Sequence, residues 1–207
     1  MVDNRVIQMS SQGYKALVNP EEGRGLNWTT DILEELPIKM KSSGPGSERP
    51  FTMPQLFMNA VKSGNDRQAL FVERNGKIQT WTWKDYYTDA MYFAKSMAHL
   101  GVKERSAVAI MGFNSPEWAI GFIGGILYNC VNTGIYSTNA PDAVLYQADH
   151  SEAEVVLCES NEHLKRFLVN LDKLPKIKAF VVYGETALPE GCSGNRFYLW
   201  SDFLRLG

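Results

Sequence analysis

The sequence predicts an α/β protein in which helices cover a parallel sheet. Four short apolar runs have the length and residue types of buried strands, and their first residues lie 24, 23 and 24 positions apart. Helical patterns fill the intervals between them. Strands that alternate with helices at this spacing indicate right-handed βα units, which place helices on both faces of a parallel sheet. The four predicted strands are residues 107–111, 131–136, 154–158 and 178–183.

The composition is that of an ordinary globular protein. The 207 residues carry a net charge of -2 and are 44% hydrophobic and 21% charged, which indicates one or two domains and excludes a disordered tail or a basic nucleic-acid binder. The longest apolar stretch, residues 118–128, is about half the ~20 residues needed to span a bilayer. We therefore expect a cytoplasmic protein whose contact with a membrane, such as the endoplasmic reticulum, is at most peripheral.

The spacing of cysteines and histidines predicts neither a disulfide framework nor a metal centre. The cysteines are odd in number and stand 28 and 34 residues apart, and the histidines lack the close Cys, His or carboxylate neighbours that a zinc site needs. We expect a reduced intracellular chain whose histidines are structural or face solvent. The residues concerned are Cys130, Cys158, Cys192, His99, His150 and His163.

The amino-terminal part of the chain should be irregular. Glycines and prolines interrupt every periodic run in residues 1–50, which we interpret as an extended arm with one helical turn near residues 30–36. Ordered structure should begin at Thr52, because Thr52 and Gln55 form a capping-box pattern ahead of helically spaced apolar residues. Gly64 and its neighbour should end that helix.

A β-hairpin and a long helix should follow. Runs 69–73 and 77–81 flank Asn75-Gly76, the pair that best tolerates the positive φ angles of a two-residue turn. Thr82, with an acidic residue three positions later, then starts a helix that Gly101 ends.

The remaining helices should lie between the predicted strands. They occupy residues 116–129, 141–148 and 161–173, with Ser115 and Ser160 as amino-terminal caps of the first and third. At the end of the chain, 198–200 resembles a strand, followed by a capped helix that begins with Ser201. The chain thus stops as a βα unit begins. This would leave the edge of a four-stranded sheet uncovered, and we interpret it as truncation.

Three segments have the pattern of possible ligand loops, and each also has a structural interpretation. At 111–118 a strand turns into a helix, where free N–H groups can bind an anion, but Glu117 in the first helical turn argues against an anion there, and Ser115 can cap the helix. The glycines of 121–125 lie inside a helical pattern and lack the spacing of a nucleotide loop, so we expect close packing. The loop at 134–141 follows a strand at its carboxyl end, where open sheets place ligands, but its Ser, Thr and Asn are equally typical of a turn.

Two clusters of side chains favour a structural role. Aromatic residues at helical spacing are typical of a core, although they could also line an apolar pocket, and the charge run of residues 159–166 is typical of a solvated helix face. No nucleophile can be paired with a base. We assign no catalytic, cofactor-binding or metal-ligating residue. The aromatic cluster consists of Trp81, Trp83, Tyr86 and Tyr87.

Several separated blocks of sequence together match one known family. They are residues 44–50 leading into 53–57, then 83–87, 108–118, 134–139 and 199–203. In this order they resemble the adenylate-forming enzymes and, more narrowly, the bubblegum-type long-chain acyl-CoA synthetases, from about residue 40 to the end. Between Gly101 and Val108 the chain lacks the Gly-Asp pair common elsewhere in the superfamily, which makes the assignment to this branch more specific.

The resemblance implies that residues 51–207 are the first part of the AMP-binding amino-terminal domain of a long-chain-fatty-acid–CoA ligase, preceded by the arm of residues 1–50. Such enzymes activate a long-chain fatty acid: its carboxylate attacks the α-phosphate of ATP in the presence of Mg²⁺, and the thiol of CoA then takes the acyl group. The family motifs for this chemistry are a Ser/Thr/Gly-rich loop ending in Pro-Lys-Gly, a Tyr-Gly-x-Thr-Glu segment, a ribose-binding Asp, an Arg, and a Lys on a mobile carboxy-terminal domain. None is present in this sequence, and the resemblance places them beyond Gly207. The parent enzyme should therefore be active and this piece inactive, with no tightly bound cofactor.

Two other functions are compatible with parts of the pattern. A non-catalytic module could pair with a full-length synthetase or hold fatty acid without activating it, because a chain that begins with Met1 could be a complete product. A Rossmann dehydrogenase would share the βα alternation, but no glycine fingerprint follows a strand here.

Overall fold

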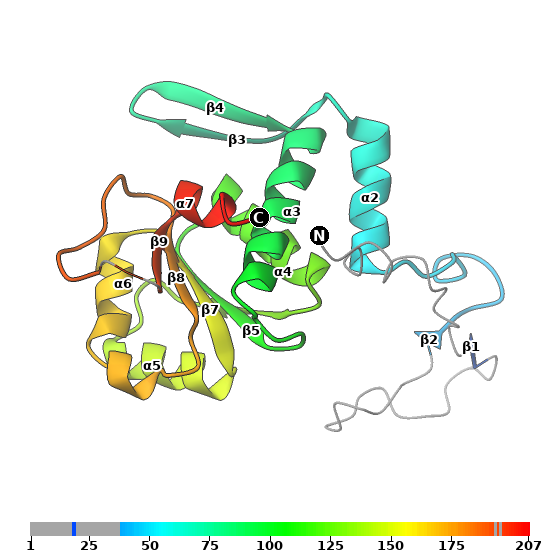
Figure 1. Ribbon diagram of the computed structural model, residues 1–207. Helices are drawn as coiled ribbons and strands as arrows, with labels where there is room; N and C mark the ends of the chain where they lie inside the picture. Colours follow the sequence, from blue (N-terminus) through cyan, green and yellow to red (C-terminus); the bar gives the residue numbers. More distant parts are fainter. Residues whose placement is uncertain (1–17, 20–37, 193, 195) are drawn as a thin grey trace. The chain divides into compact units, whose positions relative to one another are not determined.

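The computed structural model describes residues 18–19, 38–192, 194 and 196–207, and its contacts divide the chain into two units, Met1–Leu56 and Phe57–Gly207 (Figure 1). In the first unit, strand β1 (Val18–Asn19) pairs in parallel with β2 (Ile38–Lys39). The helical turn expected near residues 30–36 and most of the predicted arm lie outside the described residues.

Helix α2 (Met53–Gly64) begins at the predicted capping box. The Thr52 N–H donates to the Gln55 side chain at 3.0 Å, and the Gln55 N–H donates to the Thr52 hydroxyl at 3.2 Å, so each residue satisfies a backbone donor of the other. The predicted hairpin follows as β3 (Gln68–Arg74) and β4 (Lys77–Thr82), which pair antiparallel. Helix α3 (Trp83–His99) has a complete capping box at Thr82.

The main sheet has five parallel strands in the order β6-β5-β7-β8-β9. Four of them are the predicted strands, and the fifth corrects the expectation of a four-stranded sheet. The short run at the end of the chain pairs with β8, with Phe180 opposite Phe197 and Val182 opposite Leu199. The strands are β5 (Ala107–Met111), β6 (Val131–Ile135), β7 (Ala153–Cys158), β8 (Ala179–Val182) and β9 (Phe197–Leu199).

The helices of the sheet region follow the predicted pattern with two corrections. The third predicted helix ends early, because Asn170 has φ -126° and ψ 31°, outside the helical region, and a short 3-10 turn, η1 (Leu171–Lys173), follows it. The last helix starts at Trp200 with Leu199 as its amino-terminal cap, so Ser201 is not the cap. Leu199 is held by strand pairing, which leaves no room for a separate cap residue. The helices are α4 (Pro116–Leu127), α5 (Pro141–His150), α6 (Asn161–Leu168) and α7 (Trp200–Leu204).

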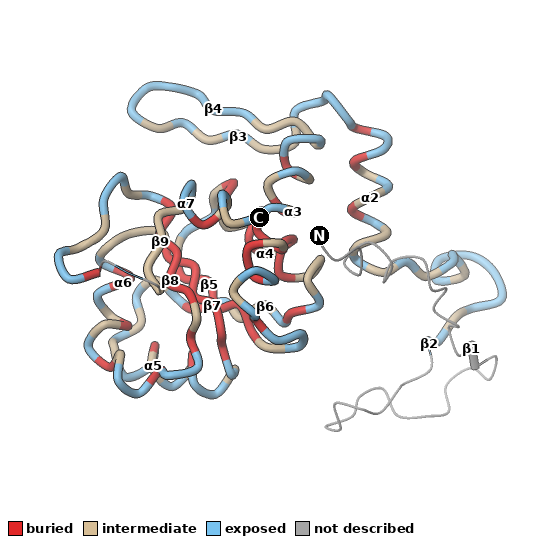
Figure 2. Tube along the Cα trace, viewed as in Figure 1, coloured by how far each residue is buried: buried red, intermediate tan, exposed pale blue. Residues whose placement is uncertain are grey.

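The sheet is covered on both faces, as its apolar strands require. Every residue of β5, β7 and β8 is buried, and Figure 2 shows these strands in red. Alternate strand residues enter two separate clusters: one packs against α5 and α6, and the other against α3, α4 and α7. A third cluster joins α2, α3 and α4 beside the hairpin. This arrangement positions the loops at the two ends of the sheet.

Candidate functional site

The carboxyl edge of the main sheet is where open α/β folds bind ligands. From β5 the chain moves to β6 on one side and then crosses to β7 on the other, so the direction of winding reverses at β5 and β7. Ligands usually bind in the crevice at such a switch point. Here the crevice lies between the turn after β5, residues 112–115, and the turn after β7, residues 159–160.

Side chains of the protein itself fill this crevice. The Glu159 carboxylate accepts a hydrogen bond from the Phe113 N–H at 2.9 Å, and the Tyr183 hydroxyl donates to the Phe113 carbonyl at 3.3 Å. A Cβ at Gly112 would lie 2.3 Å from the Tyr183 oxygen and 2.6 Å from the Glu159 Cβ. Burial raises the pKa of Tyr183, so its hydroxyl stays protonated as a donor. These contacts join the turns that follow β5, β7 and β8 at the switch point.

The start of α4, beside the crevice, is also satisfied internally. The Ser115 hydroxyl accepts from the Trp118 N–H at 3.1 Å, which confirms the predicted cap. Glu117 is 4% exposed and forms a two-pronged ion pair with Arg74, at 2.7 and 2.8 Å. Donating these hydrogen bonds to the Glu117 carboxylate raises the pKa of Arg74. The structural interpretation of this turn holds, and the Arg74–Glu117 pair, which sequence reasoning missed, ties the hairpin to α4.

An apolar pocket of about 330 Å³ lies between β3 and the start of α4. Phe71, which lines the pocket, is 65% exposed. Phe113, directly before the lining residue Asn114, is 70% exposed. Its lining has only two polar residues, Asn114 and Ser115. The full lining is Leu70, Phe71, Val72, Asn114, Ser115, Pro116, Trp118 and Ala119.

The loop after β6, a candidate ligand loop, is held by α6. The Arg166 guanidinium donates to the carbonyls of Ser137 and Asn139, and the Asn139 side-chain amide donates to Gln147 at 2.9 Å. Tyr136 is 78% exposed. The hydrogen bonds of Ser137 and Asn139 are thus those of a pinned turn, and Arg166, expected on a solvated face, is half-buried in that role.

The rest of the charge run also departs from a simple solvated face. Glu162 and Lys165 are exposed and form an ion pair at 2.5 Å, as expected of solvated residues. His163, however, is 9% exposed, and burial lowers its pKa, so the ring is favoured in its neutral form. Helix periodicity turns this face of α6 toward the sheet, where Leu164 and Phe167 are fully buried.

The glycines and aromatic residues that we expected to pack do so. A Cβ at Gly121 would lie 2.4 Å from Leu157, and one at Gly124 would lie 2.8 Å from the Phe93 ring, so α4 approaches its neighbours more closely than a side chain would allow. The aromatic cluster lies in or against the core between α2, α3 and α4. Within it the Tyr86 hydroxyl donates to the Ala119 carbonyl at 3.0 Å, and burial raises the pKa of Tyr86 to about 12.

Metal-ligating side chains do not gather within the part of the chain that the structure describes: no three His, Cys, Asp or Glu residues there are arranged to hold an ion. The three cysteines are buried free thiols. His99 and His150 are exposed. Of the helices in the described ranges, none has the length and apolarity to cross a bilayer.

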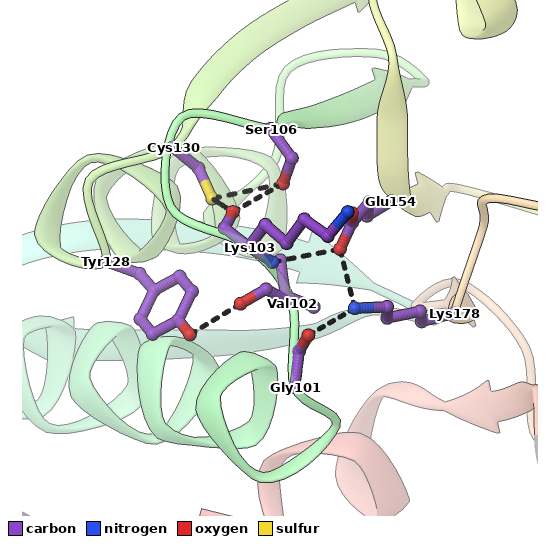
Figure 3. A network of polar contacts seen from close by, with 8 residues as sticks. All are labelled: Gly101, Val102, Lys103, Ser106, Tyr128, Cys130, Glu154 and Lys178. Carbon is purple, nitrogen blue, oxygen red and sulfur yellow. Dashed lines mark hydrogen bonds and ion pairs between the residues drawn. The ribbon is translucent and has the colours of Figure 1, made fainter.

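A polar network occupies the opposite, amino-terminal edge of the sheet (Figure 3). The Glu154 carboxylate, with a side chain 8% exposed, accepts from Lys178 Nζ and from the Lys103 N–H, each at 2.9 Å. Lys178 also donates to the Gly101 carbonyl, and the Tyr128 hydroxyl donates to the Val102 carbonyl at 2.7 Å. These bonds fasten the loop between α3 and β5 to β7, β8 and the end of α4. Each partner is satisfied by the protein, and the arrangement is structural.

One segment comes close to a motif of the family that the sequence resembles. Tyr183-Gly184-Glu185-Thr186 agrees with the first four positions of Tyr-Gly-x-Thr-Glu, but the fifth residue is Ala187. Tyr183 is turned into the sheet edge, and Glu185 accepts a hydrogen bond from the Asn161 N–H at 3.1 Å. These residues therefore contact the start of α6 and the turn after β5.

A solved structure of another protein has the same fold as this chain. The crystal structure of the anthranilate CoA ligase AuaEII in complex with anthranoyl-AMP superposes on 72% of this chain and 27% of its own, with a TM-score of 0.63 and 21% sequence identity, which shows a shared fold.

Curated relatives cover nearly all of the chain. The long-chain-fatty-acid–CoA ligase ACSBG2 of Gallus gallus is 38% identical over 201 residues, which are 97% of this chain and 26% of that protein. ACSBG1 of Homo sapiens, also a long-chain-fatty-acid–CoA ligase, is 33% identical over 188 residues, 91% of this chain and 25% of its own. The chain thus spans about a quarter of the length of these relatives. The model of the AMP-binding enzyme family matches residues 57–197. Because this match covers more than half of the sequence, the chain belongs to the AMP-binding enzyme family.

Proposed function

We propose that the chain contributes the first part of the amino-terminal domain of a long-chain-fatty-acid–CoA ligase, with residues 51–207 as that partial domain and residues 1–50 as an arm before it. The observation that carries the proposal is the similarity of almost the whole chain to about a quarter of each of two such ligases. The contacts of Glu159 and Tyr183 with Phe113 support a structural role for this edge of the sheet.

In the complete enzyme, a fatty carboxylate would attack the α-phosphate of ATP, releasing pyrophosphate, and the thiol of CoA would then displace AMP from the acyl group. Developing charge on the phosphoryl group needs donors placed in advance. The described residues include no three His, Cys, Asp or Glu side chains arranged to hold a metal ion. Their role in the proposal is to build the covered sheet and to pin its loops through Arg166, Glu159 and Tyr183.

The test compares the 207-residue chain alone with a chimera of the Gallus gallus ligase. In the chimera, this chain replaces the matching quarter of that ligase. With palmitate, ATP, Mg²⁺ and CoA, the chain alone should form no acyl-CoA, whereas the chimera should form it. Turnover by the isolated chain would overturn the assignment of the chemistry to residues outside it. A folded chimera without activity would overturn the assignment of the chain as a working part of such a ligase.

A non-catalytic module is the alternative, and the apolar pocket beside β3 is the feature that favours it, since a lipid tail needs an apolar lining. An immunoblot of the source cells separates the two: a band near 23.3 kDa favours the module, and a much larger band favours the ligase. The proposal further places the protein in the cytoplasm, with at most peripheral contact with the endoplasmic reticulum. Fractionation into cytosol and salt-washed membranes tests this placement.

A further inference from the structure

The turn of the hairpin exposes a reactive pair of residues. Asn75 and Gly76 connect β3 to β4, and both are exposed; the turn between these strands is the end of the hairpin farthest from α3 (Figure 1). Their φ angles are 53° and 71°. No described residue forms a hydrogen bond with the Asn75 side chain or the Gly76 N–H, and apart from the two neighbours of Gly76 none has an atom within 4 Å of the place where its Cβ would be. The amide nitrogen and the side-chain carbonyl are therefore open to water.

We propose that Asn75 is a site of spontaneous deamidation and that the Arg74–Glu117 ion pair sets its rate. The Gly76 backbone nitrogen, on losing its proton to hydroxide, attacks Asn75 Cγ. A nitrogen–carbon bond forms, the bond from Cγ to Nδ2 breaks, and Nδ2 leaves as ammonia. Water then opens the resulting succinimide ring at either carbonyl, which yields aspartate or isoaspartate. This modification is independent of the proposed function.

The residue after the asparagine makes this position special. A side chain on the following residue shields its backbone nitrogen, and glycine has none. Asn-Gly occurs once in the sequence. Asn114 and Asn129 are also exposed, but Ser115 and Cys130 follow them, and the Cys130 N–H donates to the Gly125 carbonyl at 2.9 Å. The deamidation rates of Asn114 and Asn129 are therefore the internal comparison for the rate at Asn75.

The ion pair gates the reaction because the turn has to open. Attack on Cγ requires rotation of the backbone at Asn75 away from its turn conformation, which separates the ends of β3 and β4. A two-stranded hairpin resists such opening weakly by itself. Arg74, directly before the turn, is held by two hydrogen bonds to Glu117, which is 4% exposed at the start of α4. Loosening this pair should raise the population of open turns and with it the rate.

The product would alter the hairpin. Isoaspartate carries the main chain through its Cβ and so adds one backbone carbon between Arg74 and Lys77, which now pair in register. It also places a carboxylate two residues after Glu73. Both changes should weaken the turn and the attachment of β3 to α4.

The experiment follows the 207-residue chain during incubation at mildly alkaline pH. A protease that cuts after glutamate frees a peptide beginning at Arg74, in which mass spectrometry and isoaspartyl methyltransferase labelling measure conversion. Asn75 should convert several times faster than Asn114. The matched control Asn75→Gly keeps a pair suited to the turn and should lose the signal. Conversion at Asn75 no faster than at Asn114 would overturn the proposal.

The gate is tested with Arg74→Lys, which keeps the charge but loses the fork geometry. We expect conversion several times faster than in the unmodified chain, whereas Lys77→Arg, at the other side of the turn, should leave the rate unchanged. If Arg74→Lys does not fold, the unmodified chain in urea replaces it and should convert faster than the native chain. Equal rates in either comparison would refute the gating role of the ion pair.

Discussion

Replacing Lys178 with methionine should destabilise the protein far more than loss of an exposed ion pair. Lys178 Nζ lies 2.9 Å from the Glu154 carboxylate, whose side chain is 8% exposed. Without it, the carboxylate keeps the Lys103 N–H as its protein donor. Breaking a buried pair costs about 3–5 kcal/mol. Because the Lys178 side chain is 32% exposed, water offsets part of the loss, and we expect a cost at the lower end, about 3 kcal/mol.

Lys176→Met is the matched control. Lys176 Nζ lies 3.1 Å from the Glu152 carboxylate, but the two side chains are 56% and 73% exposed. Exposed pairs contribute about 0–1 kcal/mol, so this change should cost at most about 1 kcal/mol. Urea unfolding followed by circular dichroism measures both free energies, provided that the slopes agree. Equal losses for the two variants would refute the claim that burial of Glu154 makes its partner important.

The pH dependence of the same pair gives a second readout. Burial opposes ionisation of Glu154, but the Lys178 ammonium and the Lys103 N–H outweigh it and lower the pKa of Glu154. A carboxyl with a lower pKa when folded contributes stability that is fully present above its unfolded pKa, about 4.3, and is lost as pH falls through the folded pKa. Glu154→Gln keeps an acceptor and should cost about 1–1.5 kcal/mol at neutral pH. The difference from the unmodified protein should shrink in acid, and a constant difference would contradict this account.

Two further changes probe α4. Gly124→Ala places a Cβ 2.8 Å from the Phe93 ring and 2.9 Å from the Ala90 carbonyl. Such overpacking should destabilise the protein by about 1–3 kcal/mol. The higher helix propensity of alanine should offset roughly 1 kcal/mol of this loss. Gly134→Ala, where no described atom outside the two neighbouring residues lies within 4 Å of the new Cβ, should leave the unfolding midpoint nearly unchanged, and similar losses for both would rule out overpacking as the cause. Ser115→Ala removes the helix cap and should lower stability by about 1 kcal/mol, whereas Ser115→Gly should cost only a few tenths, in the same assay. Equal effects of these two cap variants would contradict the role of the hydroxyl.

The elements of the fold were largely predictable because their signals are local. Capping residues such as Thr52 and Ser115, the Asn75-Gly76 turn and the apolar runs of β5 and β7 each act over a few positions, and the structure confirms them. The fifth strand was harder to place, since β9 has three residues and becomes a sheet strand only by pairing with β8. Periodicity could not reveal that partner.

The contacts at the two sheet edges were not predictable in the same way. Arg74 and Glu117 are 43 residues apart, and Lys103 and Glu154 are 51 apart, so no sequence window contains either pair. Arg166 looked like part of a solvated run, but the backbone carbonyls that it binds come from the loop after β6. Side-chain type alone does not show which backbone group will lie beside it.

Residue order thus established the βα alternation, the caps and the family blocks, since these depend on spacing along one chain. Folding established which side chains meet at the carboxyl edge of the sheet, because Glu159 and Tyr183 reach Phe113 only once β5, β7 and β8 lie side by side. Hydrogen bonds and burial depend on distances in space, and strand order, unlike strand composition, arises from the packing of the whole domain.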